Sequence, residues 1–259
     1  MDAVDAAVEA AEAAAAIIRD ARKDGLRVRH KGSIDLVTQV DLAAEQAIRS
    51  VLQAHTPSIP VLAEEGGGAD GLSTRWIVDP LDGTTNFVHG YPSYAVSIAL
   101  QVDGELRAGC VFDAVNGRAY TATAGGGAWL GDERLSVSST ETLADALLVT
   151  GFPYDRRERI DWYLSFVRAF LMKGRGLRRA GAAAMDFVAL ATGAVDGYWE
   201  FGLNPWDVAA GVLLVQEAGG IVSDMEGGEL DLDRPRLLAS NGKVHLEMSE
   251  LLSDLLHSA

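Results

Sequence analysis

The chain has 259 residues, of which 48% are hydrophobic and 23% charged, a composition typical of a soluble globular protein with ample material for a core. Its 22 Lys and Arg and 37 Asp and Glu give a net charge of −15, which argues against direct nucleic-acid binding because phosphate backbones are bound by clustered Lys and Arg. The single cysteine, Cys110, excludes an internal disulfide and a thiolate zinc cluster, and its apolar surroundings predict a buried strand.

The N-terminus lacks the basic start and apolar run of a secretory signal. The longest clearly apolar stretch, residues 208–215, is far shorter than the roughly 20 residues that a membrane span needs. We therefore expect a soluble, cytoplasmic protein that makes no membrane contact.

The first third of the chain is predicted to be helical. A polar turn around Asp24 and Gly25 follows a first amphipathic helix. A second amphipathic helix begins at Asp41, which could be its N-cap, and ends before Pro57. Apolar residues of the first helix recur at spacings of three and four, which places them on one face: Val4, Val8, Ala11, Ala15 and Ile18.

The middle of the chain has the pattern of an antiparallel meander from Tyr94 to Leu135. The dipeptides Asp103-Gly104 and Asn116-Gly117 are strong hairpin signals between its strands. Strand-like runs occupy residues 76–78, 95–102, 106–112 and 118–123.

The last part of the chain alternates between helices and strands. Such mixed order indicates layered α/β structure, and we expect one domain over residues 1–259 with subdomains of roughly 1–140 and 141–259. We expect helices at 161–173, 182–192 and 205–218, strands at 197–201, 220–223 and 237–239, and a terminal helix.

The segment with the most candidate functional residues follows the predicted strand 76–78. Asp79 and Asp82 stand three residues apart around a tight turn, and two like charges that close need a cation between them. If Thr84 begins a helix, the N–H groups of Gly83 and Thr84 can hold a phosphate. Taken alone, the same residues could form an ordinary solvated turn.

Two further acidic segments stand at the ends of predicted elements. An apolar strand, residues 59–63, ends in Glu64 and Glu65, which could also be plain surface acids. Asn204 is a candidate N-cap, and Asp207 then lies in the first turn of its helix, where it could merely offset the helix dipole.

Together these segments resemble the inositol monophosphatase family over almost the whole chain. Residues 79–89 (DPLDGTTNFVH) and 206–211 (WDVAAG) are similar to the two signature motifs of that family. Further segments match in the same order: Lys31 with Asp35-Leu36-Val37-Thr38 and Asp41, Ala63 to Glu65, and residues 178–183, 196–200 and 217–220.

The resemblance implies a five-layer αβαβα sandwich of the sugar phosphatase type, in which carboxylates hold two or three Mg²⁺ ions. Glu64, Asp79 and the carbonyl of Leu81 would bind the first ion. The second ion would be bound by Asp79 together with Asp82 and Asp207, and Asp41 would support a weaker third site. Oxygen ligands of this kind suit Mg²⁺, a hard cation.

The implied reaction is hydrolysis of a phosphate monoester by metal-activated water. Glu64 and the Thr84 hydroxyl would orient that water, with Asp82 as the third catalytic residue, while Gly83 and Thr84 would bind phosphate. The rest of the substrate site would comprise Asp82, Gly181, Ala182, Ala183, Glu200 and Asp207, with Glu200 as acceptor for the hydroxyls of a polyol ring.

The preferred substrate on this resemblance is myo-inositol-1-phosphate, and a lithium-sensitive homodimer is implied. Fructose-1,6-bisphosphate, histidinol phosphate and a 3′-phosphorylated nucleotide remain alternative substrates for the same chemistry. A role of a different class also remains open, namely binding to the transcription machinery with little catalysis.

Overall fold

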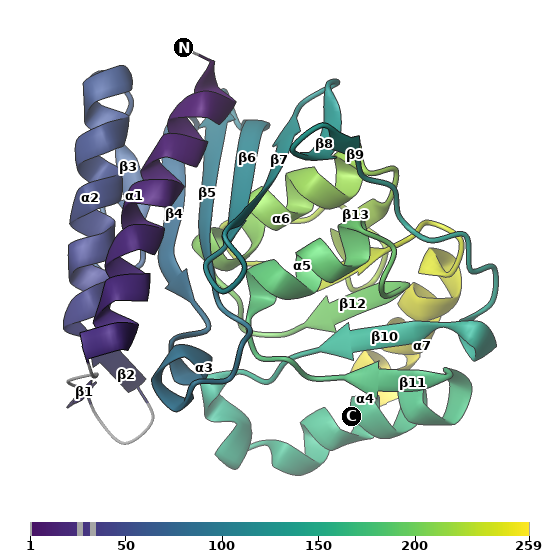
Figure 1. Cartoon of the computed structure of the whole chain (residues 1–259). Coiled ribbons are helices and arrows are strands. Elements are labelled where there is room, and N and C mark those ends of the chain that lie inside the picture. The colour runs from purple at the N-terminus through teal and green to yellow at the C-terminus, as the bar shows by residue number, and fades with distance from the viewer. Residues whose placement is uncertain (1, 25–27, 32–34, 259) are drawn as a thin grey trace.

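The computed structural model describes residues 2–24, 28–31 and 35–258, and the side chains of residues 23–38 and 258 lie outside this description. Helices and sheets alternate in five layers (Figure 1). The expected αβαβα sandwich is thus confirmed. Its helical layers are α1 (Ala3–Asp24) with α2 (Gln39–His55), then α5 (Ala183–Ala191) with α6 (Pro205–Glu217), then α4 (Ile160–Lys173) with α7 (His245–Ser258).

The first large sheet has seven strands in the order β3-β4-β5-β6-β7-β8-β9. Its strands from β4 onward pair antiparallel, which confirms the predicted meander, whereas β3 runs parallel to β4. Cys110 is buried in β6. The strands are β3 (Val61–Ala63), β4 (Arg75–Asp82), β5 (Ala95–Val102), β6 (Glu105–Asp113), β7 (Arg118–Thr123), β8 (Gly127–Leu130) and β9 (Glu133–Arg134).

The second large sheet has five strands and is mixed, in the order β11-β10-β12-β14-β13. Parallel pairing joins β10 to β11 and β12, and antiparallel pairing joins β14 to β12 and β13. Its strands are β10 (Leu147–Thr150), β11 (Gly176–Arg178), β12 (Gly197–Glu200), β13 (Ile221–Asp224) and β14 (Leu237–Ser240).

Some elements differ from the expectation. The strands β10 and β11 were not predicted, nor were β1 (Val28–Lys31) and β2 (Asp35–Thr38). Helix α2 begins at Gln39, so Asp41 is a buried residue of its first turn and not its N-cap. The turn predicted at Asp24 and Gly25 falls partly on residues 25–27, outside the described residues.

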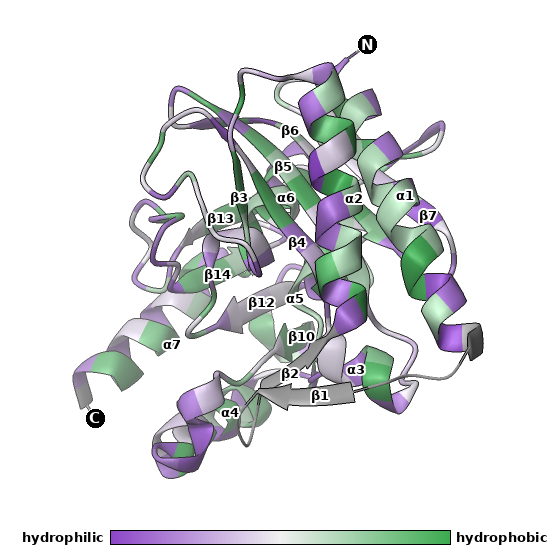
Figure 2. Ribbon diagram, turned by 90° about the vertical axis from the view of Figure 1, so that its left-hand side faces the viewer, coloured by the Kyte–Doolittle hydropathy of each residue, from purple (hydrophilic) through white to green (hydrophobic). Residues whose placement is uncertain are grey.

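The two outer helical layers each cover one face of a sheet. Hydrophilic and hydrophobic residues alternate along α1 and α2 (Figure 2), as expected of helices with one buried face. Their apolar face, which includes Ile18, Ile48 and Leu52, packs on β4, β5 and β6.

None of the helices in the described part of the chain is long and apolar enough to cross a lipid bilayer.

Helix α6 lies between the two large sheets and is therefore buried on nearly every side. All residues from Val208 to Val215 are buried, which explains the apolar run seen in the sequence. Gly211 allows α6 to approach α5 closely, because a Cβ atom at this position would overlap the ring of Phe187. The central layer is thus packed at a distance that only glycine permits.

Replacing Gly211 by alanine is expected to destabilise the protein. In an exposed helix the change would add about 1 kcal/mol of stability, but here the overlap with Phe187 should cost about 1–3 kcal/mol instead. Urea unfolding measures the difference. The control is Gln216→Ala, at an exposed position of the same helix, where a change within about 0.5 kcal/mol is expected. A Gly211→Ala variant as stable as the native protein would contradict this packing.

Candidate active site

A β-bulge in β4 brings the two acids of the central motif to one side of the strand. Asp79 pairs with Ser97 and Asp82 pairs with Ala95. Strand β4 therefore advances three residues where β5 advances two. Side chains alternate along a strand, and the extra residue returns Asp82 to the side of Asp79. Pro80 lies within the bulge, a position at which a strand tolerates a residue without a backbone N–H group. The strand therefore extends to Asp82 and does not end at Val78, as the sequence suggested.

Asp82 connects the first sheet to the central helices. Its carboxylate oxygens accept hydrogen bonds from the backbone N–H groups of Ala183, at 3.1 Å, and Ala184, at 2.8 Å, in the first turn of α5. Asn86 supports the same junction, since its side-chain amide donates to the carbonyls of Ala180 and Gly181. The carboxylate of Asp82 is thereby held in one orientation.

Gly83 allows the chain to turn from β4 into the short helix α3 (Thr84–His89). Its φ is +85°, in the left-handed region that favours glycine. A Cβ atom here would lie 2.9 Å from the carbonyl oxygen of Ser93 and 3.0 Å from the Cβ of Ala182. Both geometry and space therefore require glycine between Asp82 and Thr84.

These elements meet at a pocket of about 230 Å³. The pocket lies between the bulge of β4, the end of β12 and the start of α6. These segments are far apart in the sequence but lie close together in the fold (Figure 1). The pocket brings together these residues singled out in the sequence: Glu64, Asp79, Leu81, Asp82, Gly83, Thr84, Gly181, Ala182, Ala183, Glu200 and Asp207.

Other residues of the motifs stand apart from the pocket. Asp41 does not line it, although its charge acts on Glu64 from the first turn of α2. The side chains of Lys31, Asp35 and Thr38 lie outside the described residues.

The pocket also has a wall that sequence reasoning missed. Phe152 to Arg156 follow β10, and β10 runs parallel to β12, whose last residue is Glu200. The carboxyl ends of parallel strands meet at one edge of a sheet, so recognising β10 would have placed this segment beside Glu200. The missed residues are Thr85, Phe152, Pro153, Tyr154, Arg156, Arg179, Gly202, Leu203 and Asn204.

The pocket carboxylates repel one another. Burial, reinforced by the charge of Asp207, raises the pKa of Asp82 to about 7. Burial likewise raises the pKa of Glu64 to about 8, with added repulsion from Asp207 and three other acids, and that of Asp207 to about 6. The pKa of Asp79 also lies well above its usual range for the same reasons. Such a set of groups favours a bound cation.

The donors fit a hard cation such as Mg²⁺. Carboxylates and the carbonyl of Leu81 offer only oxygen, and Asp79 uses one of its two carboxylate oxygens, Oδ1, to accept the N–H of Leu81. Among the described residues, no three His, Cys, Asp or Glu side chains are already arranged to hold one ion. This arrangement is consistent with Mg²⁺, which is typically bound by one or two carboxylates and completes its octahedron with waters and substrate phosphate.

Glu200 and Thr84 are each oriented by one hydrogen bond. The Tyr198 hydroxyl donates to Glu200 at 2.6 Å, and burial raises the pKa of Glu200 to about 7. Gly151 leaves room for this carboxylate, because a Cβ atom there would overlap it. The Thr84 hydroxyl donates to the carbonyl of Leu81 at 3.0 Å, which leaves its lone pairs available to accept a hydrogen bond from water.

Comparison with known proteins gives this geometry its context. A Nus factor SuhB of Pseudomonas aeruginosa is 45% identical over 228 residues, which cover 86% of this chain and 84% of that protein. An inositol-1-monophosphatase of Mesorhizobium japonicum is 44% identical over 218 residues, which cover 83% of this chain and 82% of that protein. A solved inositol monophosphatase from Anabaena (Nostoc) has a TM-score of 0.87 at 39% identity, with 97% of this chain and 95% of that chain covered.

Fold, pocket and relatives together define a hydrolase of phosphate monoesters. The sequence pattern of the Inositol monophosphatase family matches residues 1–257. The chain belongs to this family, which is a family of metal-dependent phosphatases.

The raised pKa values predict how the stability of the metal-free protein depends on pH. The usual pKa values of Glu64, Asp82 and Asp207 are 4.5, 3.8 and 3.8, and folding raises them to about 8, 7 and 6. Between these limits the folded chain binds more protons than the unfolded chain, so the free energy of unfolding falls as pH rises. We expect the melting temperature to fall by roughly 3 °C or more from about pH 5.5 to about pH 8.5, and added Mg²⁺ to reduce the fall.

Differential scanning calorimetry with and without chelator measures this dependence. Asp82→Asn removes one of the repelling charges and should flatten the profile. Asp145→Asn, which removes an exposed acid paired with Arg175, should leave it unchanged. Equal slopes in the native protein and in Asp82→Asn would show that the pocket carboxylates are not the cause.

Proposed function

We propose that the protein hydrolyses myo-inositol-1-phosphate to myo-inositol and phosphate with the help of Mg²⁺. The observation that carries this proposal is that the carboxylate cluster and Glu200 face one pocket. One part of the pocket suits cations and a phosphate, and Glu200 suits the hydroxyl groups of a polyol. Relatives named inositol-1-monophosphatase support this choice of substrate.

In this proposal Glu64, Asp79, Asp82, Asp207 and the carbonyl of Leu81 hold two Mg²⁺ ions. Asp41 supports a third, more weakly bound ion. When bound, the ions supply positive charge that makes phosphorus more electrophilic and water more acidic.

The protein's own groups orient the reactants. Glu64 accepts a proton from the attacking water, and Thr84 accepts a hydrogen bond from the same water. Asp82 is the third catalytic residue and also lies next to the substrate. The N–H groups of Gly83 and Thr84 donate to phosphate oxygens.

The polyol ring lies between Glu200, Asp82 and Ala183 in this proposal. Gly181 and Ala182 form the adjoining wall, and Asp207 contacts the substrate from the start of α6. Glu200 accepts hydrogen bonds from ring hydroxyls, and Tyr198 keeps its carboxylate in place. A buried acceptor of this kind discriminates against substrates that lack the matching hydroxyl.

A second candidate substrate class carries a further anionic group. Arg156 and Arg179 line the same pocket and bring positive charge to it. Fructose-1,6-bisphosphate and a 3′-phosphorylated nucleotide belong to this class, and histidinol phosphate is a further alternative. A role in binding the transcription machinery is a rival of a different class, for which the name Nus factor SuhB of one relative is the support.

We also propose that residues 1–259 act as one catalytic domain with subdomains of roughly 1–140 and 141–259, since both parts line the pocket. The protein is proposed to work in the cytoplasm as a lithium-sensitive homodimer. We expect it to bind neither a membrane nor nucleic acid directly.

Phosphate release from a panel of substrates tests the proposal. The purified protein is assayed with Mg²⁺ and inositol-1-phosphate, fructose-1,6-bisphosphate, histidinol phosphate or adenosine 3′,5′-bisphosphate. The highest kcat/KM is expected for inositol-1-phosphate. Preference for a bisphosphate would favour the second candidate class, and no release from any substrate despite Mg²⁺ binding would favour the binding role.

Asp82→Asn is expected to abolish turnover while the protein stays folded. The amide removes a proposed metal ligand, yet its carbonyl oxygen can still accept one N–H from the first turn of α5. Steady-state kinetics and circular dichroism measure the two effects. Full activity of this variant would contradict the proposed mechanism.

Glu200→Ala is expected to impair inositol-1-phosphate hydrolysis far more than hydrolysis of p-nitrophenyl phosphate. Loss of a buried acceptor for ring hydroxyls should reduce kcat/KM for the polyol substrate by about tenfold or more. Tyr198→Phe, which removes only the group that orients Glu200, is the matched control and should have a smaller effect. Equal losses on both substrates in Glu200→Ala would mean that this residue does not recognise the ring.

A further inference from the structure

Glu64 stands at the start of a tight loop that follows β3. Ala63 and Gly67 close this loop, because the N–H of Gly67 donates to the Ala63 carbonyl at 2.9 Å and the N–H of Ala63 donates back at 3.4 Å. The N–H of Glu64 donates to the carbonyl of Val78 in β4. The direction of the Glu64 side chain therefore depends on how residues 63–67 are held.

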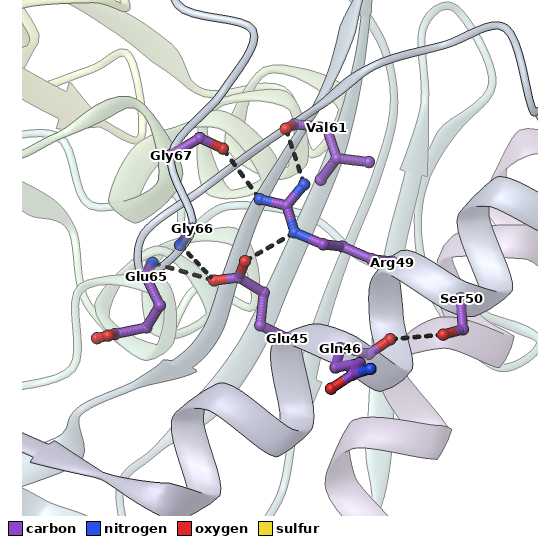
Figure 3. Close-up of polar contacts among 8 residues, drawn as sticks. All are labelled: Glu45, Gln46, Arg49, Ser50, Val61, Glu65, Gly66 and Gly67. Atoms are coloured by element: carbon purple, nitrogen blue, oxygen red, sulfur yellow. Dashed lines mark hydrogen bonds and ion pairs between the residues drawn. The ribbon is translucent and has the colours of Figure 1, made fainter.

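Glu45 of α2 holds the middle of this loop. It is 5% exposed, and its Oε2 accepts the backbone N–H groups of Glu65, at 3.0 Å, and Gly66, at 3.1 Å (Figure 3). Its other oxygen, Oε1, accepts from Nε of Arg49, one helical turn further along α2, at 2.7 Å. Both carboxylate oxygens are thus engaged, one with the loop and one with Arg49.

Arg49 holds the two sides of the same loop. Its Nη1 donates to the carbonyl of Val61, before Glu64, at 3.2 Å, and its Nη2 donates to the carbonyl of Gly67, after Glu64, at 2.9 Å (Figure 3). A planar guanidinium can serve these carbonyls and the carboxylate of Glu45 at once, which an ammonium group cannot do. Two side chains of one helix therefore make five hydrogen bonds that fix the loop and each other.

Gly66 provides an independent sign that the loop is fitted to this pair. A Cβ atom at Gly66 would overlap Oε1 of Glu45 and would lie 2.9 Å from Nη2 of Arg49. The loop backbone therefore lies directly against the ion pair. Helix α2 can act as a rigid support, since its residues Ile48 and Leu52 are fully buried in the core beneath it.

We infer that Glu45 and Arg49 are positioning residues that hold Glu64 toward the pocket and thereby set the affinity of the site for Mg²⁺. This inference rests on the proposed role of Glu64 as a metal ligand. Glu64 needs such support because its neighbours Asp207, Glu65, Asp41 and Asp82 repel its charge. A loop free to move would carry Glu64 away from them and leave the cation with a weaker set of ligands.

Glu45→Gln is the most direct test. The amide can still accept the loop N–H groups through its oxygen, but its NH₂ group then faces Nε–H of Arg49, so the pair is broken. The Mg²⁺ concentration for half-maximal activity is expected to rise about tenfold or more. The kcat at saturating Mg²⁺ should stay within about threefold, since the reacting groups themselves are unchanged.

A readout independent of turnover accompanies the kinetics. Isothermal titration with Mg²⁺ in the absence of substrate should show the same loss of affinity. Arg49→Lys serves as a second variant, in which the positive charge remains but only one nitrogen can donate, and a smaller shift in the same direction is expected. Ile48→Val is the matched control, because it loosens the core under α2 without touching the loop, and its Mg²⁺ dependence should equal that of the native protein.

The possible outcomes separate this inference from the proposed function. An unchanged Mg²⁺ requirement in Glu45→Gln and Arg49→Lys would overturn the inference alone, provided that the native enzyme is Mg²⁺-dependent. A loss of stability like that of Ile48→Val, without a change in Mg²⁺ affinity, would reduce the pair to a structural role and overturn the inference as well. A native protein that neither binds Mg²⁺ nor hydrolyses any ester would overturn the proposed function and the inference together.

Discussion

Mutual repulsion among the carboxylates of one pocket is the constraint around which this structure is arranged. Each of three acids has backbone N–H partners that hold it in place: Leu81 for Asp79, the first turn of α5 for Asp82, and Asn204 for Asp207. These hydrogen bonds lower the pKa values of the carboxyl groups, yet burial and neighbouring charges still leave them raised. The fold therefore holds the acids closer together than they would lie if they were free to separate.

The layered architecture makes this proximity possible. Glu64 and the bulge of β4 come from the first sheet, Glu200 from the second, and Asp207 from the helix between them. Asp82 accepts N–H groups of α5, so a side chain of one sheet is bonded to the layer that separates the two. The pocket is thus formed where three layers meet, and packing of the central layer affects its geometry directly.

How much could be predicted from sequence depended on the local signals that mark each element. Helix α6 and strand β5 were placed to within a residue. Asn204 and an apolar run mark α6, and the hairpin signal Asp103-Gly104 marks the end of β5. Strand β10 was missed although β12, which is equally short, was predicted. With β10, the pocket wall formed by Phe152, Pro153, Tyr154 and Arg156 was missed as well. Motif spacing placed Asp79, Asp82 and Thr84 together, but only the register of β4 and β5 explains why two acids three apart share one side.

Residues that act through others are harder to predict still. Glu45 and Arg49 have the spacing of an ordinary surface ion pair on a helix, and such pairs contribute little on their own. What distinguishes them is the position of the loop 63–67 against α2, which no local pattern encodes. Their contacts to backbone N–H and carbonyl groups are a tertiary feature, visible only once β3 is placed beside α2.

Charge balance connects these observations. A protein of net charge −15 must offset its own negative field where it binds a phosphate. The pocket offers Arg156 and Arg179 for that purpose, together with the carboxylates that we propose to hold cations. If the carboxylates could relax, repulsion would fall, and with it the free energy that a cation gains by neutralising them. Rigid support of the loop converts repulsion in the empty state into affinity for a cation. The same effect is shared by the Glu45–Arg49 pair, the bulge of β4 and the first turn of α5: each keeps the repelling carboxylates from moving apart.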